Sequence, residues 1–459
     1  MLLPRLGGIV PKLNLPVPVS IFIIYVVCLT PILLLLYLEL SKRAAAARNP
    51  KGCRKLGLHN FSNLNDEDDY DTSGRRKRRQ PSKNSTDMEK IRIKALLAYP
   101  IKSCAAVEFN IADVVSTGMA YDRQFCFAEY FEATPAAVTE AEKCSTAPPA
   151  TGQWVARTLR DGKYSKMTLI RPEIWIPDPS SPTYSPKRSE VRSKGVLVIN
   201  YPRIPTGSSL TRLLTSLGMK FHLCAREEYF HVPLHPPPKH TYPSAPMRIW
   251  KESPMAFDYG KHLPPSLLAF LGSSKPVTLF RVDPDHHRSV FRCAPRKDAL
   301  GFQPITGFAD AYPLHLLGLG SVRDIAERTR YTIRSLSVKR FRPNVVLEGS
   351  EAFAEDGWKR IRILPRDGQA QKNAEKEGVE VYTACRTVRC RLPNVDPDTG
   401  VRHAVEPDKT LKSFRCIDPG DVNNACLGMQ CVPAVQEFTL RVGDEIQVLE
   451  SGEHFYIKQ

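Results

Sequence analysis

The chain has 459 residues, which is enough for two or three domains that each bury a core. Its apolar fraction of 42% and charged fraction of 25% exclude a chain that is disordered throughout. The formal net charge is +17, but no zinc-finger, RRM-type or helix-turn-helix pattern accompanies it, so we expect no nucleic-acid partner. Twelve cysteines without the spacing of a disulfide scaffold indicate reduced thiols, and hence a body that faces the cytosol.

The uncharged run from Val17 to Leu38 predicts one transmembrane helix within residues 1–40. As a helix this run would rise about 33 Å, enough to cross the hydrocarbon core of a bilayer. A cleaved signal peptide is the alternative, because residues 44–47 resemble a cleavage site, but the run is too long for such a peptide. Basic residues gather after the run rather than before it, so the body is expected on the cytosolic side.

Residues 41–88 are predicted to form a disordered, charged tether. The segment contains an acidic patch at residues 66–69 and a basic run at residues 75–79. A solvated linker is one interpretation of the basic run, and a weak attraction to anionic lipid headgroups is the other. The N-x-S/T triplets at Asn60 and Asn84 would stay unglycosylated on the cytosolic side.

From Ile91 onwards the pattern predicts a mainly β fold of the α+β class, with β-barrels and helices packed outside them. Short apolar runs predict strands at residues 91–99, 125–127, 167–176 and 196–199. Helices are predicted at residues 263–271 and 314–328. Pro-rich segments at residues 177–187 and 235–246 are expected to be surface loops. Gly443-Asp444 is predicted to form a turn between two alternating apolar stretches.

Two segments carry residue types that suit an anionic ligand. Lys102 and Ser103 follow a predicted strand, where lysine supplies a point charge and serine donates a hydrogen bond. A surface lysine is the alternative. Arg342 and Asn344 precede an apolar strand, and arginine can clamp a phosphate there with two hydrogen bonds. An ion pair of Arg342 with Glu355 or Asp356 fits the spacing equally well.

A third segment suits a soft metal. Cys390 follows Arg389, whose charge favours the thiolate, and thiolates bind soft metals. A buried structural cysteine is one alternative and a zinc site is another. Several further candidate zinc ligands lie in this half of the chain, but no C-x-x-C pair occurs among them: Cys385, His403, Cys416, Cys426 and Cys431.

Together and in this order, these segments resemble the MOSC family, and in particular its amidoxime-reducing members. The stretch YPIKSC at residues 99–104, with Gly118 and Asp122-Arg123, is similar to the N-terminal β-barrel module of that family. RFRPNVVLEG at residues 340–349 is similar to the MOSC domain. So are Ala354-Glu355-Asp356, Trp358, Arg389-Cys390, VDPDTG at residues 395–400, Glu406-Pro407, Thr410-Leu411, Phe414-Arg415 and VGD at residues 442–444.

The resemblance covers about residues 89–450 apart from insertions. It implies a β-barrel module at residues 89–235, an insertion with a connecting helix at residues 236–274, and a MOSC domain at residues 275–454. It further implies that Cys390 is catalytic and supplies a thiolate to the molybdenum of a molybdenum cofactor. Arg389 would line the same pocket, and the pterin and its phosphate would be held by Lys102, Ser103, Arg123, Arg342 and Asn344.

This chain departs from the family pattern at three places. Ala311-Tyr312 stand where the family has Thr-Ser, Val388 replaces a common serine, and Leu427-Gly428 replace Phe-Gly. These changes bear on substrate preference and on the fine geometry of the cofactor.

The activity that the resemblance implies is reduction of N-hydroxylated substrates such as amidoximes and hydroxylamines. Electrons would come from a b-type cytochrome and its flavin reductase, and the membrane would be the mitochondrial outer membrane rather than the endoplasmic reticulum. The chain has no G-x-G-x-x-G fingerprint of its own, which agrees with external reductants. Two alternatives remain, a sulfur carrier or sulfurase-like MOSC protein and a non-catalytic cofactor-binding protein. Pyridoxal phosphate is not expected on this chain, and the sequence names neither the physiological substrate nor the oligomeric state.

Overall fold

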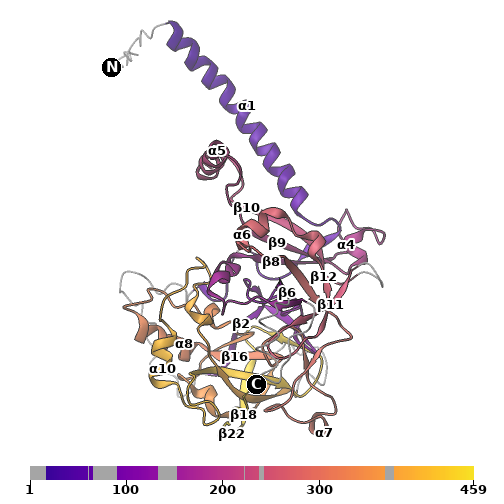
Figure 1. The fold of residues 1–459 in the computed structure, drawn as a ribbon, viewed down its shortest axis with the longest axis vertical. Coiled ribbons are helices and arrows are strands. Elements are labelled where there is room, and N and C mark those ends of the chain that lie inside the picture. The colour runs from indigo at the N-terminus through magenta and orange to yellow at the C-terminus, as the bar shows by residue number, and fades with distance from the viewer. Residues whose placement is uncertain are drawn as a thin grey trace, which may run out of the picture. The chain divides into compact units, whose positions relative to one another are not determined.

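A computed structural model describes residues 17–59, 61–65, 90–132, 152–221, 223–236, 242–366 and 377–458 (Figure 1). The chain divides into two compact units, Met1–Lys51 and Gly52–Gln459. The acidic patch at residues 66–69, the basic run at residues 75–79, Asn60 and Asn84 lie outside the described residues.

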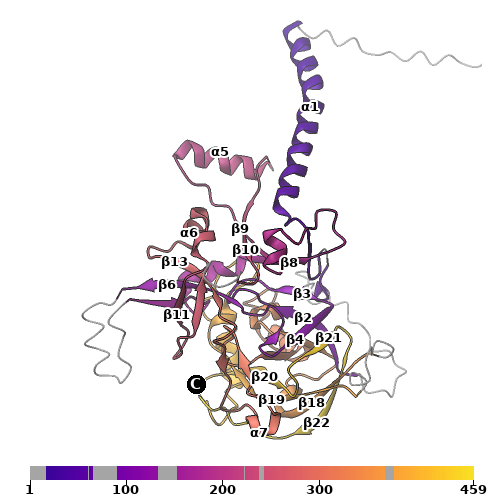
Figure 2. The same cartoon turned by 90° about the vertical axis from the view of Figure 1, so that its right-hand side faces the viewer.

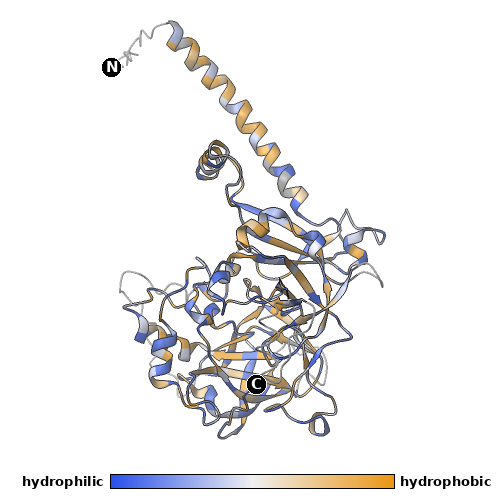
Figure 3. Cartoon of the chain, viewed as in Figure 1, coloured by the Kyte–Doolittle hydropathy of each residue, from blue (hydrophilic) through white to orange (hydrophobic). Residues whose placement is uncertain are grey.

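The first unit contains a single long helix, α1 (Val17–Arg48). Hydrophobic colouring extends over most of its length (Figure 3), and apolar side chains such as Phe22 and Leu35 are exposed. Within the described parts of the chain, however, no helix meets the combined demand of length and apolarity for a membrane span. The predicted transmembrane helix therefore lacks support from the structure.

In the second unit, five strands close into a barrel. Neighbouring strands are antiparallel except for the parallel contact between β11 and β7. In barrel order they are β11 (Ser244–Arg248), β12 (Met255–Asp258), β13 (Val277–Val282), β6 (Phe125–Phe131) and β7 (Gln153–Ala156). Residues 236–274, predicted to be an insertion with a connecting helix, supply the strands β11 and β12 to this barrel. Strands of four or five residues show too little alternation to be read from sequence.

The largest sheet of the described residues has eight strands, and its first strand, β17, also pairs with β2, the strand next to its other end. Their order is β17 (Val345–Glu348), β16 (Leu314–Gly318), β20 (Cys426–Pro433), β19 (Val379–Val388), β18 (Trp358–Leu364), β22 (Glu445–Ser451), β2 (Arg92–Ala98) and β3 (Val107–Phe109). The predicted strand at residues 91–99 is β2. This strand pairs with strands from far along the chain, so the early and late parts of the sequence share one sheet.

Three smaller sheets complete the strands. The first contains β1 (Cys53–Lys55), β8 (Arg171–Pro177), β9 (Val196–Pro202) and β10 (Glu227–Pro233). The second contains β21 (Phe438–Arg441), β4 (Ile111–Val115) and β5 (Gly118–Met119). The third pairs β14 (Arg288–Ser289) with β15 (Ile305–Thr306). The tether prediction was wrong at β1, which pairs with β8 and is held by an ion pair between Lys55 and Glu173 at 3.1 Å. Gly443-Asp444 does turn the chain, but it passes from β21 in one sheet to β22 in another.

Seven α-helices occur in the described residues: α1, α4 (Ser189–Arg192), α5 (Ser209–Lys220), α6 (Pro265–Leu271), α7 (Lys297–Leu300), α8 (Leu319–Thr329) and α10 (Asp408–Phe414). Five 3-10 helices accompany them: η1 (Gly162–Leu169), η2 (Gly260–His262), η3 (Val338–Phe341), η4 (Ala354–Gly357) and η5 (Leu392–Asn394). The predicted helix at residues 263–271 is confirmed as α6. The helix predicted at residues 314–328 begins only at Leu319, because residues 314–318 pair within the sheet as β16. Likewise, the strand predicted at residues 167–176 begins at Arg171.

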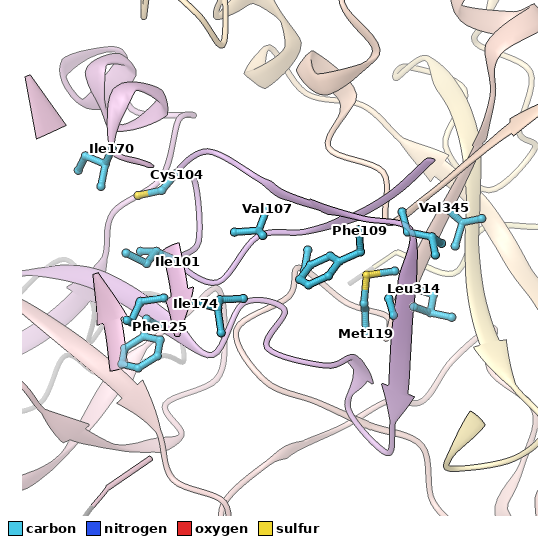
Figure 4. Packing of buried hydrophobic residues seen from close by; sticks show 14 of the residues in the cluster. Ile101, Cys104, Val107, Phe109, Met119, Phe125, Ile170, Ile174, Leu314 and Val345 are labelled. Atoms are coloured by element: carbon cyan, nitrogen blue, oxygen red, sulfur yellow. The ribbon is translucent and has the colours of Figure 1, made fainter. Parts of the chain in front are cut away.

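One buried apolar cluster extends through the barrel and the large sheet. Phe125 of β6 belongs to it, as do Leu314 of β16 and Val345 of β17 (Figure 4). The cluster also includes Phe109 and Ile174, from the strands β3 and β8. Because these elements bury their side chains against one another, the two predicted modules share part of their core, while the barrel strands also enclose a smaller apolar cluster of their own.

Candidate functional site

A cavity of about 600 Å³ lies between residues of the barrel and residues of the eight-stranded sheet. Trp250 follows the barrel strand β11, whereas His315 of β16 and Thr387 of β19 belong to the sheet. Three carboxylates line the cavity, Glu252, Asp310 and Asp421, against ten basic side chains: Lys102, Arg123, Arg160, Lys251, Arg288, Arg292, Arg342, Arg386, Arg389 and Lys458. Such an excess of cations in one cavity suits an anionic ligand.

The structure brings all the predicted site residues to this cavity: Lys102, Ser103, Arg123, Arg342, Asn344, Arg389 and Cys390. They reach it from segments far apart in the chain. Lys102 and Ser103 follow β2, Arg123 precedes β6, Arg342 ends η3, and Arg389 and Cys390 follow β19. The strand pairing of the large sheet is what makes these segments neighbours.

Two arginines of the cavity lie against the same tyrosine ring. The guanidinium of Arg342 is 4.1 Å, and that of Arg123 4.8 Å, from the ring centre of Tyr99. Arg123 is also paired with Asp122 and donates to the carbonyl of Arg342 at 3.0 Å. Burial by itself lowers the pKa of Arg123, but Asp122 outweighs burial and the pKa is raised. Arg123 is therefore a neutralised cation that positions the Arg342 backbone.

Arg342 is different, because no carboxylate among the described residues forms an ion pair with it. The proposed partners are engaged elsewhere: Asp356 pairs with Arg415, and Glu355 accepts hydrogen bonds from Ser321 at 2.8 Å and from the Gly318 amide at 3.2 Å. The ion-pair alternative for Arg342 was therefore wrong. Burial lowers the pKa of Arg342 to about 10, and its Nη2 is buried without a hydrogen-bond partner in the described part of the chain. A buried guanidinium nitrogen that lacks an acceptor can donate its hydrogen bond to an anionic ligand.

Backbone strain gathers around the same cavity. Eight non-glycine residues in the described part of the chain have positive φ, and five of them line the cavity: Ser103, Arg123, Trp250, Arg292 and Arg342. Such conformations cost free energy, and they persist where surrounding contacts enforce them, most often at functional sites.

Lys102 is buried and its charge is already balanced. Its Nζ pairs with Asp310 and donates to the Phe308 carbonyl at 2.8 Å. Burial lowers the pKa of Lys102, and Asp310 opposes that shift. Burial alone would raise the pKa of Asp310, but Lys102 and then Arg160 outweigh burial and hold that pKa below its ordinary value. The surface-lysine alternative was wrong, and Asp310 is a cavity residue that the sequence did not indicate.

Arg389 forms a second network at the sheet side of the cavity. It donates to the carbonyls of Phe341 and Leu427, both at 3.0 Å, and its Nη2 lies 2.7 Å from His315 Nε2. Because a guanidinium has only donors, His315 Nε2 must accept, and its Nδ1 then donates to the Arg342 carbonyl at 3.3 Å. Burial, reinforced by Arg389, lowers the pKa of His315 well below its ordinary value. His315 is therefore neutral, and no sequence pattern distinguishes it from a core histidine of a strand.

The two neighbouring cysteines occupy different surroundings. Cys390 is partly exposed and lines the cavity. Burial lowers the pKa of Arg389 to about 10, and Cys390 opposes this shift. Cys385 is fully buried in an apolar cluster with Val290 and Val432. A hydrogen bond with Cys293, and then burial, raise the pKa of Cys385 well above its ordinary value, and of the two thiols only that of Cys390 lines the cavity.

Two predicted ligand-holding residues use their side chains within the protein. The Asn344 amide donates to the Leu97 carbonyl at 3.1 Å, and its oxygen accepts from the His315 amide at 3.1 Å and from Arg123 at 3.3 Å. The Ser103 hydroxyl accepts from the Leu159 amide at 3.2 Å. Asn344 thereby ties β2 to β16, and both residues shape the cavity wall.

The departures from the family pattern lie at or beside the cavity. Ala311, Tyr312 and Val388 line it. Gly428 has φ +74°, and a Cβ there would lie 2.6 Å from the Leu316 carbonyl oxygen and 2.8 Å from His315 Nε2. Only glycine fits this position without displacing His315.

The zinc alternative finds no support, since no group of three or more His, Cys, Asp or Glu side chains in the described ranges is arranged to hold a metal ion.

Comparison with protein families matches the same two regions of the chain. The family model described as the MOSC domain matches residues 304–447, and the one described as the MOSC N-terminal beta barrel domain matches residues 90–140. The MOSC match includes His315, Arg342 and Cys390, and the N-terminal match includes Lys102 and Arg123. The cavity thus combines residues of both domains.

Three similar proteins have related names. Mitochondrial amidoxime-reducing component 1 of Danio rerio is 32% identical over 46% of this chain and 56% of its own length. The protein of the same name from Homo sapiens is 31% identical, over 31% of this chain and 38% of its own length. Mitochondrial amidoxime reducing component 2 of Rattus norvegicus is 36% identical, over 24% and 28%. The chain therefore spans about half or less of the length of these curated relatives.

Among solved structures, the YUAD protein of Bacillus subtilis aligns with this chain at 12% identity and a TM-score of 0.17, covering 35% of this chain and 73% of that one. A similarity this weak supports no conclusion.

The neutral state of His315 in the MOSC domain predicts a pH dependence of stability. An unfolded histidine takes up a proton near pH 6.5, whereas His315 in the folded protein does not. The contribution of His315 to the free energy of unfolding is therefore complete above that pH and is lost as the pH falls. His315→Gln keeps an acceptor for Arg389 but removes the titration. We expect its thermal midpoint to fall less than that of the wild type between about pH 7.5 and about pH 5.5. Equal falls in the two proteins would contradict a neutral His315, and all other titrating groups cancel in the comparison.

Proposed function

We propose that this chain is a molybdenum-cofactor oxidoreductase that reduces N-hydroxylated compounds such as amidoximes and hydroxylamines. The observation that carries the proposal is a cavity lined by two partly buried arginines, Arg342 and Arg389, that have no carboxylate ion pair among the described residues, and by the thiol of Cys390. The names of the relatives support the same substrate class.

The residues present fit a pterin that carries a phosphate. A cavity of about 600 Å³ is within the usual range for small-molecule sites. The buried and unpartnered Nη2 of Arg342 calls for an acceptor that the described protein residues do not supply, and a phosphate oxygen would provide one. Arg342 would hold the phosphate. Arg123 and Asn344 would position it, and Lys102, balanced by Asp310, would contribute less charge.

Cys390 would supply the protein ligand to molybdenum, because its sulfur is a soft-metal ligand and its partly exposed side chain lines the cavity. When bound, the cofactor supplies the two-electron redox chemistry that cleavage of an N–O bond requires. The overall reaction consumes two electrons and two protons and converts a hydroxylamine to an amine and water. His315 fixes the orientation of Arg389 and is itself held neutral, so its role is one of positioning.

The electrons would come from a b-type cytochrome and its flavin reductase. Two features support external donors: the chain has no nucleotide-binding fingerprint, and its net charge of +17 suits an acidic docking partner. The names of the relatives also support a mitochondrial location.

The metal ligand is tested with Cys390→Ser. A hydroxyl cannot replace a thiolate without changing the redox centre, so we expect the variant to fold but to lose nearly all reduction of benzamidoxime by dithionite-reduced dye, which bypasses the cytochrome. The matched control is Cys385→Ala, five positions earlier, which leaves the apolar cluster intact and should stay active. Loss of activity in the control alone would make Cys385 the ligand. Full activity in both variants would refute the reductase proposal.

The phosphate contact is tested with Arg342→Ala. One charge-assisted hydrogen bond contributes about 1.5–3 kcal/mol, so the variant should retain the pterin at least about tenfold more weakly. Pterin fluorescence after dialysis measures retention. Arg328→Ala is the control, because this exposed arginine does not line the cavity and its contacts are an ion pair with Asp324 and the ring of Phe414. If the Arg342 variant keeps as much pterin as the control, Arg342 does not hold the phosphate.

We further propose that α1 attaches the protein to the mitochondrial outer membrane, with the body in the cytosol. The proposal rests on the uncharged run from Val17 to Leu38 and on the exposure of its apolar side chains. A chain that begins at Gly52 retains β1 and all other strands. It should be recovered in the soluble fraction with its cofactor, whereas the full chain should resist carbonate extraction from mitochondria. A full chain released by carbonate, or a shortened chain that stays on the membrane, would contradict attachment through α1.

A further inference from the structure

The helix α5 interrupts an otherwise simple strand connection. β9 and β10 are antiparallel neighbours, yet residues 203–226 separate them and fold as a helix with two connecting arms. Both views of the molecule show α5 apart from the strands that it connects (Figures 1 and 2). No residue of the helix is buried.

The exposed residues of α5 include a stripe of large apolar side chains. Leu210, Leu213, Leu214 and Leu217 are spaced at i, i+3, i+4 and i+7, and Phe221 extends the stripe just past the helix. Their exposed fractions are 65%, 57%, 60%, 41% and 66%. Residues at this spacing share one helix face, about 100° wide. Single exposed leucines are ordinary, but a continuous face of them marks a binding surface.

Local contacts hold this helix in shape without the body of the protein. The Ser208 hydroxyl caps the first turn by accepting from the Thr211 amide at 3.3 Å. After the helix, the Leu223 amide donates to the Gly218 carbonyl at 2.8 Å, and Arg226 donates to the Met219 carbonyl at 3.1 Å. The apolar stripe contributes to none of these contacts, so it remains available.

The charge of the segment indicates what covers the stripe. Residues 203–226 include four basic residues and no acidic one: Arg203, Arg212, Lys220 and Arg226. Arg212 and Lys220 are exposed on α5 itself and lie off the leucine face. A single helix with an apolar face and a basic remainder is typical of segments that lie in the surface of an anionic bilayer. There the leucines enter the acyl boundary while the cations meet the headgroups.

We propose that α5 is an interfacial helix that lays its leucine face in the surface of a membrane containing anionic lipid. This contact is separate from α1 and does not depend on the redox function. It would hold the body of the protein to the bilayer at a second point.

Hydrogen exchange with mass spectrometry tests the proposal on the full chain reconstituted in vesicles, because it reports α5 separately from any attachment by α1. In vesicles of phosphatidylcholine with phosphatidylserine, amides of residues 209–221 should exchange at least about tenfold more slowly than in phosphatidylcholine alone. The double variant Leu213→Ser/Leu217→Ser should lose this protection. Met219→Ser, off the leucine stripe, is the matched control and should keep it.

A second double variant, Arg212→Gln/Lys220→Gln, keeps the leucine face and should lose only the part of the protection that phosphatidylserine adds. Unchanged exchange at β19 and β20 confirms that each variant is folded. The proposal is overturned if the two kinds of vesicle protect α5 equally. It is also overturned if protection rises with the ratio of protein to lipid, which would identify a second copy as the occupant, or if it requires an added soluble protein.

Discussion

The site depends on holding three positively charged side chains, those of Arg123, Arg342 and Arg389, close together at one cavity. Arg342 and Arg123 both lie over the ring of Tyr99. Arg389 is linked to Arg342 through His315, which accepts a hydrogen bond from Arg389 and donates one to the Arg342 carbonyl. Buried cations repel one another and lose hydration, so each must be compensated. Asp122 compensates Arg123, and carbonyl oxygens with His315 satisfy Arg389. Arg342 is left without an acidic partner among the described residues, and this asymmetry gives the cavity its preference for an anion.

The architecture enforces that arrangement through β2. This strand pairs with β3, β17 and β22, and the residues after its end include Lys102 and Ser103, which line the cavity, and Tyr99, whose ring contacts Arg123 and Arg342. Asn344 then joins the strand to β16 by bonding to Leu97 and to the His315 amide. Since the apolar core runs without a break from the barrel into the sheet, the two walls of the cavity cannot separate freely. Strained conformations at Ser103, Arg123 and Arg342 can persist under such constraint.

Arg389 and His315 show how a residue remote from the ligand can matter. Gly428 leaves room for the imidazole, the imidazole accepts from Arg389, and Arg389 lies beside Cys390. A neutral imidazole is required, because a protonated ring would face the guanidinium with a second positive charge. The replacement of Phe-Gly by Leu427-Gly428 keeps the glycine on which this chain of contacts depends, and the Leu427 carbonyl accepts from Arg389 at 3.0 Å.

Local sequence patterns determined a part of this protein. The long uncharged run forms a helix, the apolar run at residues 91–99 forms a strand, and the residues chosen for their chemistry all line one cavity. Tertiary structure decided the rest. Asp310 and His315 have no distinguishing pattern, since their roles arise from contacts with Lys102 and Arg389, which are far away in sequence. The short strands β1, β11 and β12 escaped prediction for the same reason, because hydrogen bonds to distant partners stabilise them where local propensity does not.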